Sequence, residues 1–196
     1  MKLHLACGSV YLKDYINIDI KGELVKDNPQ LVEENTTTLD NYFKKSYVKR
    51  ILGHNARGRI VVDILSDVKK LPFEDDTVDE ILTVNLVDHI RLQEIPTMFN
   101  EWHRILKSGG KLIIDVGDAI GNAKLLADAK TDDELEWALR LMYCHSRDEF
   151  DSHRWGYTAN YLTNVLQKYG FNYLWDKTDY IEHVYPAFQL CVEAVK

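Results

Sequence analysis

The sequence predicts an α/β fold, built as a doubly wound, mainly parallel sheet with an antiparallel strand pair near its C-terminal end. Short apolar runs alternate with longer amphipathic stretches, which is typical of parallel strands joined by helices. The last two runs follow each other without an intervening helix, which favours an antiparallel pair. The chain has 196 residues, enough to bury a core without a disulfide or metal. We therefore expect a single domain over residues 1–196.

Charge and cysteine usage narrow the functional classes. The chain has 24 basic and 31 acidic residues, a net charge of −7, which argues against nucleic acid as the main partner. Cys7, Cys144 and Cys191 lack the spacing of a disulfide framework or a zinc motif, and free cysteines favour a cytoplasmic location. No stretch approaches the roughly 20 apolar residues of a membrane span, so we expect no membrane partner. The sequence does not indicate an oligomeric state.

Seven apolar runs predict strands, most of them rich in β-branched residues and bounded by turn signals. In chain order the runs are Lys2–Ala6, Ile16–Ile20, Arg59–Ile64, Glu80–Val84, Lys111–Val116, Phe171–Tyr180 and Phe188–Val195, with Pro186 separating the last two.

Helical periodicity predicts five helices. They are Leu39–Leu52, Ile90–Leu106, Ala119–Asp128, Asp132–Cys144 and Thr158–Tyr169. Pro96 places the regular start of the second helix near itself, and Gly109-Gly110 is expected to end that helix. Thr158 is the expected N-cap of the last helix and Gly170 its end.

Two single residues mark the ends of the first two strands. Gly8 follows the first strand, where the lack of a Cβ lets the backbone approach a ligand. Asp19 ends the second strand, where a carboxylate can accept hydrogen bonds from both hydroxyls of a ribose. Each has an ordinary alternative: a tight turn for Gly8, and a helix cap or an exposed loop position for Asp19.

Two further motifs follow the third and fourth strands. Residues 67–75 begin with Asp67 and Val68 and contain a stiff Leu-Pro-Phe turn, so the carboxylate can bind an adenine amine or the segment can be an ordinary connection. After the fourth strand, Asn85 supplies both a donor and an acceptor. His89 lies nearby, and it can act as a base near neutral pH or serve as a structural histidine.

In order and spacing these motifs resemble those of class I S-adenosylmethionine-dependent methyltransferases. The resemblance is to a small branch that opens with Leu-x-Leu-Gly-Cys-Gly-Ser and a short Gly-Tyr-Ile-Asn-Ile-Asp segment, here residues 3–9 and 14–19. The Asp-x-x-x-Leu-Pro-Phe and Leu-Glu-His blocks correspond to residues 67–73 and 87–89. The Trp-x-Arg-Val-Leu-Lys-Pro-Gly-Gly block corresponds to residues 102–110. Residues 21–58 and 119–150 are not matched.

The resemblance implies a Rossmann-like methyltransferase fold, S-adenosylmethionine as cofactor and a set of binding residues. Ala6, Cys7 and Gly8 would line the methionine end, and Asp19 would bind the ribose. Asp67 and Val68 would bind the adenine, and Asn85 and Leu86 would border the methyl group. If the acceptor is a hydroxyl, a base helps to remove its proton, and from its position His89 is the candidate catalytic residue.

The sequence departs from the family pattern in its first crossover. Ala6 stands where glycine is common, and Asp19 follows Gly8 by only 11 residues. Because a parallel crossover generally needs a dozen or more residues, the first crossover helix must be reduced to about a turn, and we expect one face of the sheet to be exposed there.

The acceptor is expected to be a small molecule or a sugar, bound between residues 115–121 and 145–157, a late stretch dense in polar and aromatic side chains. A metal held by Asp148, Asp151 and His153 is a minor alternative, because the trio lacks a recognised spacing. Two other functions remain open. One is a non-catalytic methyltransferase-like binding module or partner subunit. The other is a nicotinamide-dependent oxidoreductase, for which the GxGxxG motif is missing.

Overall fold

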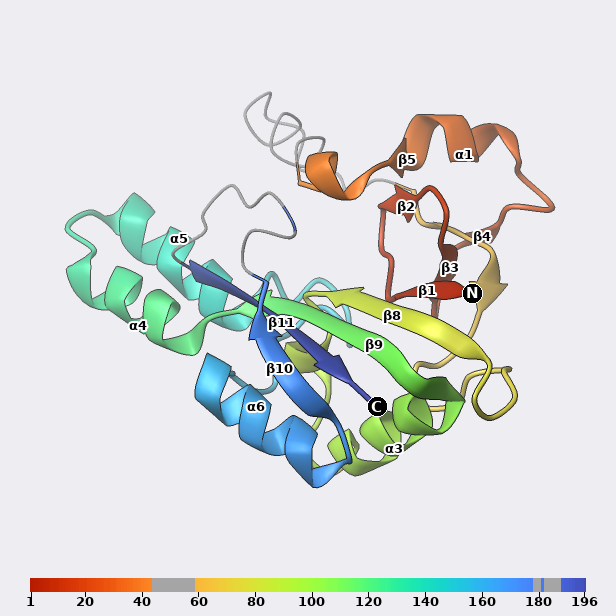
Figure 1. Cartoon of the computed structure of the whole chain (residues 1–196). Helices are drawn as coiled ribbons and strands as arrows, with labels where there is room; N and C mark the ends of the chain where they lie inside the picture. Colours follow the sequence, from red (N-terminus) through yellow and green to blue (C-terminus); the bar gives the residue numbers. More distant parts are fainter. Residues whose placement is uncertain (44–58, 178–180, 182–187) are drawn as a thin grey trace.

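The computed structural model describes residues 1–43, 59–177, 181 and 188–196. A seven-stranded sheet crosses the molecule in the order β10-β11-β9-β8-β1-β3-β7 (Figure 1). The strands from β9 to β7 are parallel to one another, and β11 runs antiparallel to both β9 and β10. This arrangement confirms the predicted fold class.

Strands β1, β3, β8 and β11 follow the predicted apolar runs closely, whereas β9 begins earlier than predicted, at Leu106. The bounds of the main-sheet strands are β1 Lys2–Leu5, β3 Ile16–Asp19, β7 Ile64–Leu65, β8 Val78–Val84, β9 Leu106–Gly117, β10 Asn172–Asp176 and β11 Gln189–Val195. Two small ribbons pair β2 (Tyr11–Leu12) with β5 (Thr36–Thr37) and β4 (Glu23–Leu24) with β6 (Val61–Val62). The last three residues of the predicted strand 171–180 and Pro186 lie outside the described residues.

The helices are α1 Gln30–Asn35, α3 Ile95–Ile105, α4 Ala119–Asp128, α5 Asp132–Tyr143 and α6 Ala159–Lys168, with short 3₁₀ turns η1 Leu39–Asn41 and η2 Val87–His89. Of the predicted helix 39–52, the part up to residue 43 shows only the η1 turn, and the remainder is not described. In the part of the chain that the structure describes, no helix is long and apolar enough to cross a membrane.

Several predicted helix ends are confirmed. Pro96 occupies the first turn of α3, the Thr158 side chain accepts from the Tyr161 backbone N–H at 3.2 Å, and Gly170 follows α6 with φ +86°. The expectation that Gly109-Gly110 ends α3 is wrong. The helix ends at Ile105 and leads directly into β9, where the two glycines lie in an irregular part of the β8–β9 pairing. Gly109 has φ +75° there, a conformation that glycine adopts without strain.

The predicted strand 59–64 is divided in two, because Asp63 interrupts it. The Asp63 carboxylate accepts from the Asn17 backbone N–H at 2.7 Å and from the Tyr11 hydroxyl at 2.8 Å. Val61–Val62 therefore pairs with β4, whereas Ile64–Leu65 joins the main sheet beside β3. The result brings the end of β7 next to the end of β3.

The shortened first crossover is confirmed, because only the β2 ribbon lies between β1 and β3. The expected exposure of the sheet face is wrong. On that face His4 and Leu82 are fully buried, and Leu12 and Tyr42 pack over them, with Leu39 partly buried beside them. Segment 39–43 supplies the cover that a crossover helix would have given. The opposite face packs against α3 and α6 (Figure 1).

His4 is the polar centre of this cover. Its Nδ1–H donates to the Asn17 Oδ1 at 2.9 Å, and its Nε2 accepts from the Tyr42 hydroxyl at 2.9 Å. The second bond needs the neutral imidazole, because a protonated Nε2 cannot accept a hydrogen bond. Burial lowers the pKa of His4 to about 4, against a smaller opposing effect of the Asn17 hydrogen bond.

His4 makes folding sensitive to acid. The depressed pKa means that its contribution is fully present above pH 6.5 and is lost as the pH falls towards 4. Between pH 7 and 5 we expect it to remove about 2 kcal/mol from the free energy of unfolding, measured by urea denaturation. His4→Gln should be less stable at pH 7 but should lack this component of the pH dependence. Equal pH dependences in the two proteins would contradict this assignment.

Candidate functional site

The ends of four parallel strands border one pocket, which we call the strand-end pocket. It has a volume of about 270 Å³. Seven predicted site residues line it: Ala6, Asp19, Asp67, Val68, Asn85, Leu86 and His89. They follow or end β1, β3, β7 and β8. These strands are hydrogen-bonded neighbours in the sheet, so their carboxyl ends lie together.

Cys7 and Gly8 lie beside this pocket without lining it. The Cys7 thiol is buried against the carbonyl oxygens of Gly8 and Val61, and burial raises its pKa well above the usual value. The Gly8 backbone N–H donates to Asp19 Oδ2 at 2.9 Å. A Cβ placed on Gly8 would meet no atom within 4 Å, so the backbone here faces open space.

Two of the residues around the pocket have a left-handed backbone. Ala6 has φ +52°, which strains a residue with a Cβ, and Asn85 has φ +51°, which asparagine adopts more readily than most residues. The Asn85 backbone N–H donates to the Asp115 carbonyl at 2.8 Å, which fixes the turn after β8 to the neighbouring strand. Strain of this kind is concentrated at functional sites.

The two predicted carboxylates of the pocket, Asp19 and Asp67, keep free acceptor positions. Asp19 is mostly buried and accepts from the backbone N–H groups of Gly8 and Lys21. Asp67 accepts from the Lys69 backbone N–H at 2.9 Å, and its other oxygen lies 3.5 Å from the Lys69 ammonium. Since a carboxylate has about four acceptor sites, each retains capacity for a ligand.

Residues 145–157, which we call the late loop, close one side of the strand-end pocket. The sequence did not predict this contact. Glu149, Phe150 and Arg154 line the pocket beside the predicted residues. Lys21, which follows β3, holds this loop through an ion pair with Asp148 at 2.5 Å and lies 5.5 Å from the centre of the Phe150 ring. The density of polar and aromatic residues in 145–157 indicated a binding loop, but nothing in the pattern linked it to the end of β3.

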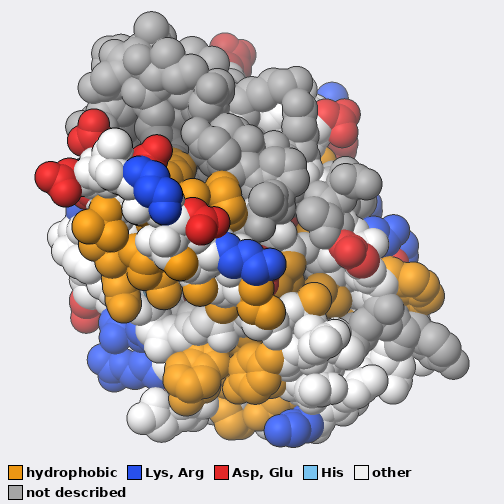
Figure 2. Space-filling view, turned by 90° about the vertical axis from the view of Figure 1, so that its left-hand side faces the viewer, with side chains coloured by type: hydrophobic (Ala, Val, Ile, Leu, Met, Phe, Trp, Pro, Cys, Tyr) orange, Lys and Arg blue, Asp and Glu red, His pale blue; other side chains and the backbone are white. Residues whose placement is uncertain are grey.

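A second pocket of about 300 Å³, which we call the loop pocket, lies where the acceptor was expected. Its lining comes from the η2 turn, the end of β9, the start of α4, the end of α5 and the late loop. These residues are Asp88, Gly117, Ala119, Asn122, Leu141, Met142, Tyr143, His153, Arg154, Trp155 and Gly156. Hydrophobic side chains gather on the face around α4 and α5 (Figure 2). The contribution of α5 was not predicted.

Unpaired polar atoms mark the boundary between the two pockets. Asp88 Oδ1, His89 Nδ1 and Asn122 Oδ1 are buried and have no hydrogen-bond partner. Burial lowers the pKa of His89, so its imidazole is neutral at pH 7. The boundary therefore offers hydrogen-bond acceptors and an unprotonated nitrogen to whatever binds there.

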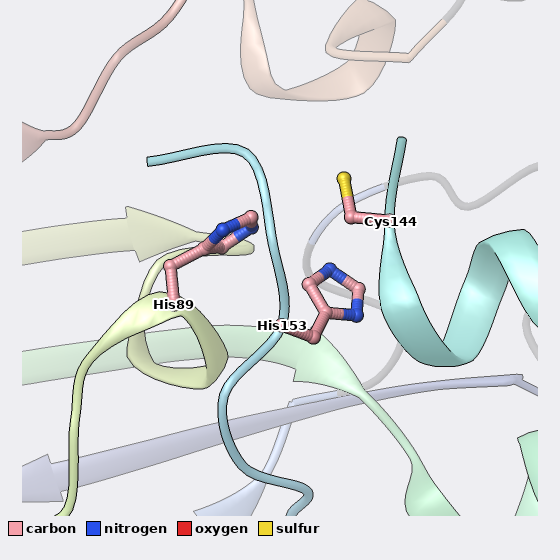
Figure 3. A group of neighbouring side chains, drawn as sticks. All are labelled: His89, Cys144 and His153. Carbon is pink, nitrogen blue, oxygen red and sulfur yellow. The ribbon is translucent and has the colours of Figure 1, made fainter. Parts of the chain in front are cut away.

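The trio Asp148, Asp151 and His153 is not gathered into a metal site. Asp148 pairs with Lys21, and the buried Asp151 carboxylate pairs with Arg147 at 2.5 Å. The structure instead brings His89, Cys144 and His153 together, with their potential ligand atoms within 4.8 Å of one another (Figure 3).

The comparisons with known proteins agree with this geometry. A family model described as a methyltransferase domain matches residues 3–114. The chain belongs to this methyltransferase family. The predicted resemblance is thus confirmed, and the matched residues contain every strand end that borders the strand-end pocket.

Solved structures and curated proteins extend the likeness. A methyltransferase from Thermotoga maritima, described as a possible histamine N-methyltransferase, matches the whole of this chain at 13% sequence identity and a TM-score of 0.53. The match covers 81% of that protein's chain. A methyltransferase from Methanosarcina mazei matches at 18% identity, 91% of that chain and a TM-score of 0.52. The mitochondrial arginine-hydroxylase NDUFAF5 of Rattus norvegicus is 26% identical over the whole chain and 49% of its own length. The chain thus spans about half the length of this relative.

The Arg147–Asp151 pair sets the shape of the late loop. Burial would raise the pKa of Asp151, but hydrogen bonds from the Arg147 side chain and backbone hold it well below its usual range. Arg147→Met leaves a buried carboxylate unpaired, so we expect a loss of about 3 kcal/mol in the free energy of unfolding.

Arg140→Met is the matched control, because Arg140 pairs with Glu136 on an exposed face of α5. It should cost about 0.5 kcal/mol or less. Urea denaturation of both variants checks the difference, and equal losses would show that burial of Asp151 does not determine the outcome.

Proposed function

We propose that this protein transfers a methyl group from S-adenosylmethionine to a small, hydroxylated acceptor such as a sugar. The observation that carries the proposal is the strand-end pocket, in which Asp19, Asp67 and Asn85 lie together at the ends of neighbouring strands. In this proposal Asp19 binds the ribose, Asp67 and Val68 bind the adenine, and Asn85 and Leu86 border the methyl end. The backbone around Ala6 and Gly8 borders the methionine portion.

The loop pocket is the proposed acceptor site. It adjoins the strand-end pocket through Arg154, which lines both, and through the neighbouring residues Asp88 and His89. The unpaired oxygens of Asp88 and Asn122 can accept hydrogen bonds from hydroxyl groups, and Trp155 offers a partly exposed aromatic surface. A hydroxylated molecule with an apolar face satisfies both features.

The chain contributes mainly by orienting its ligands. When bound, S-adenosylmethionine supplies a methyl group activated by its positively charged sulfur, which becomes a neutral thioether once the acceptor has taken the methyl. The two adjoining pockets hold the acceptor beside this methyl end, which lowers the entropic part of the barrier. Glu149, Phe150 and Arg154 of the late loop border the cofactor pocket on one side. His89 is neutral and lies at the boundary, where its imidazole can take the proton that the acceptor loses.

Cofactor binding is the first test. Asp19→Asn keeps the shape of the side chain but removes its charge, so we expect the affinity for S-adenosylhomocysteine to fall by roughly 10- to 100-fold. Isothermal titration calorimetry measures this directly. Asp14→Asn is the control, since Asp14 is exposed in the same crossover. Equal affinities for Asp19→Asn and wild type would remove Asp19 from the binding site.

The same titration separates the alternatives. Binding of NAD without the sulfur compounds would indicate the oxidoreductase. Cofactor binding without methyl transfer to any of a panel of sugars, hydroxylated small molecules and arginine-containing peptides would favour the non-catalytic module. Arginine peptides are included because the rodent relative is named an arginine-hydroxylase.

The acceptor site has its own test. Trp155→Ala should raise the KM for the acceptor about 10-fold or more through the loss of aromatic contact, while leaving the affinity for S-adenosylhomocysteine unchanged. Steady-state kinetics and calorimetry on the same protein check both values. Trp175→Ala is the matched control, because Trp175 is similarly exposed but lies on β10. A weakened affinity for S-adenosylhomocysteine with an unchanged KM for the acceptor would show that Trp155 acts at the cofactor site and not at the acceptor site.

A further inference from the structure

His89, Cys144 and His153 come from three separate segments and meet at the boundary of the two pockets. His89 ends the η2 turn after β8, Cys144 follows α5, and His153 belongs to the late loop (Figure 3). The His89 and His153 rings are perpendicular, with centroids 4.7 Å apart. One potential ligand atom from each residue lies within 4.8 Å of the other two.

Hydrogen bonding at one ring nitrogen of His153 leaves the other available to a cation. The His153 Nδ1 lies 3.1 Å from the Met142 carbonyl oxygen, so Nδ1 carries a hydrogen. The Nε2 faces the cluster and lies 3.3 Å from an oxygen of the Asp88 carboxylate. The nearby His89 Nδ1 and Asp88 Oδ1 are buried without a donor.

Cys144 is held at the cluster in a strained backbone conformation. Its φ and ψ are 61° and −160°, a region that is essentially restricted to glycine and costs other residues about 1–3 kcal/mol. The thiol donates to Asp151 Oδ1 at 3.3 Å. Asp151 keeps its ion pair with Arg147, so the carboxylate stays paired if the thiol loses its proton.

We propose that His89, Cys144 and His153 form a zinc site. Two imidazole nitrogens and one thiolate are a donor set that zinc prefers, and three protein ligands leave a fourth position open, as in catalytic zinc sites. Tetrahedral zinc places such atoms roughly 3.3–3.7 Å apart, so side-chain shifts of about 1 Å close the site. The His153 Nδ1–H donates to the Met142 carbonyl at 3.1 Å, which is the kind of hydrogen bond that commonly supports a zinc-bound histidine from outside the ligand set. Asp88 Oδ2 lies 3.3 Å from Nε2 and places a negative charge beside the metal.

The position of the site suggests what the metal does, and this part rests on the proposed function. His89 lines the strand-end pocket and His153 the loop pocket, so the open position lies between cofactor and acceptor. A hydroxyl of the acceptor bound there would lose its proton to solvent more easily, and its oxygen would then be the better nucleophile. A His89 that binds zinc cannot also accept the proton, so zinc replaces His89 as the activating group.

Zinc titration of the metal-free protein against a chromophoric chelator tests the site. We expect one equivalent to bind wild type, and His89→Gln, Cys144→Ser and His153→Gln to weaken binding by roughly 100-fold or more. Asp88→Asn should weaken it by about 10-fold or more, because it removes a negative charge beside the metal. His103→Gln and Cys191→Ser are matched controls, since these residues lie on α3 and β11. Both controls should bind zinc like wild type.

Cobalt(II) provides a second readout that depends on the sulfur. The cobalt-loaded wild type should show a thiolate-to-metal absorption band that is absent in Cys144→Ser and present in Cys191→Ser. Zinc binding unaffected by Cys144→Ser and His153→Gln, or no zinc binding by wild type, would overturn the proposal.

Calorimetry with S-adenosylhomocysteine on the same proteins separates the two claims. If the cofactor binds and zinc does not, the metal site is wrong and the proposed function stands with His89 as base. If zinc binds and the cofactor does not, the metal site stands without the proposed role.

Discussion

Parallel pairing of β7, β3, β1 and β8 is the constraint on which the rest of the structure depends. Leu5 pairs with Ile18 on one side and Thr83 on the other, so β1, β3 and β8 end at almost the same level. Whatever follows these strands must therefore meet at one edge of the sheet. Asp19, Asp67 and Asn85 are far apart in sequence and come together for this reason alone. The strand-end pocket is thus a direct consequence of sheet register.

Because the first crossover has no helix, hydrogen bonds between polar side chains stabilise this face of the sheet. Asn17 connects β3 to the β2 ribbon through its amide, which bonds to the Leu12 backbone and to His4. Asp63 holds the Asn17 backbone from the neighbouring strand. Tyr42 then covers His4 on the sheet face. This small network replaces apolar helix packing, which makes the fold more sensitive to protonation at this point than a helix-covered sheet would be.

Much of the fold and the cofactor site could be predicted from the sequence, because both follow from local patterns. Apolar runs located β1, β3, β8 and β11 to within about two residues, and the residue after each parallel strand indicated the pocket. The division of the strand at Asp63 could not be predicted, since it depends on hydrogen bonds from Tyr11 and Asn17. The ion pair by which Lys21 holds the late loop could not be predicted either, because it joins segments that are far apart in sequence. The His89, Cys144 and His153 cluster carries no spacing motif, because α5 and the late loop alone bring Cys144 and His153 to η2.

A crystal structure of the protein with S-adenosylhomocysteine bound would locate the cofactor site without reference to the acceptor. We expect the ribose hydroxyls to lie against Asp19, the adenine beside Asp67 and Val68, and the sulfur near Asn85 and Leu86, with the loop pocket left open to solvent. Binding in the loop pocket, or in the strand-end pocket with the ribose away from Asp19, would show that the strand ends do not form the cofactor site.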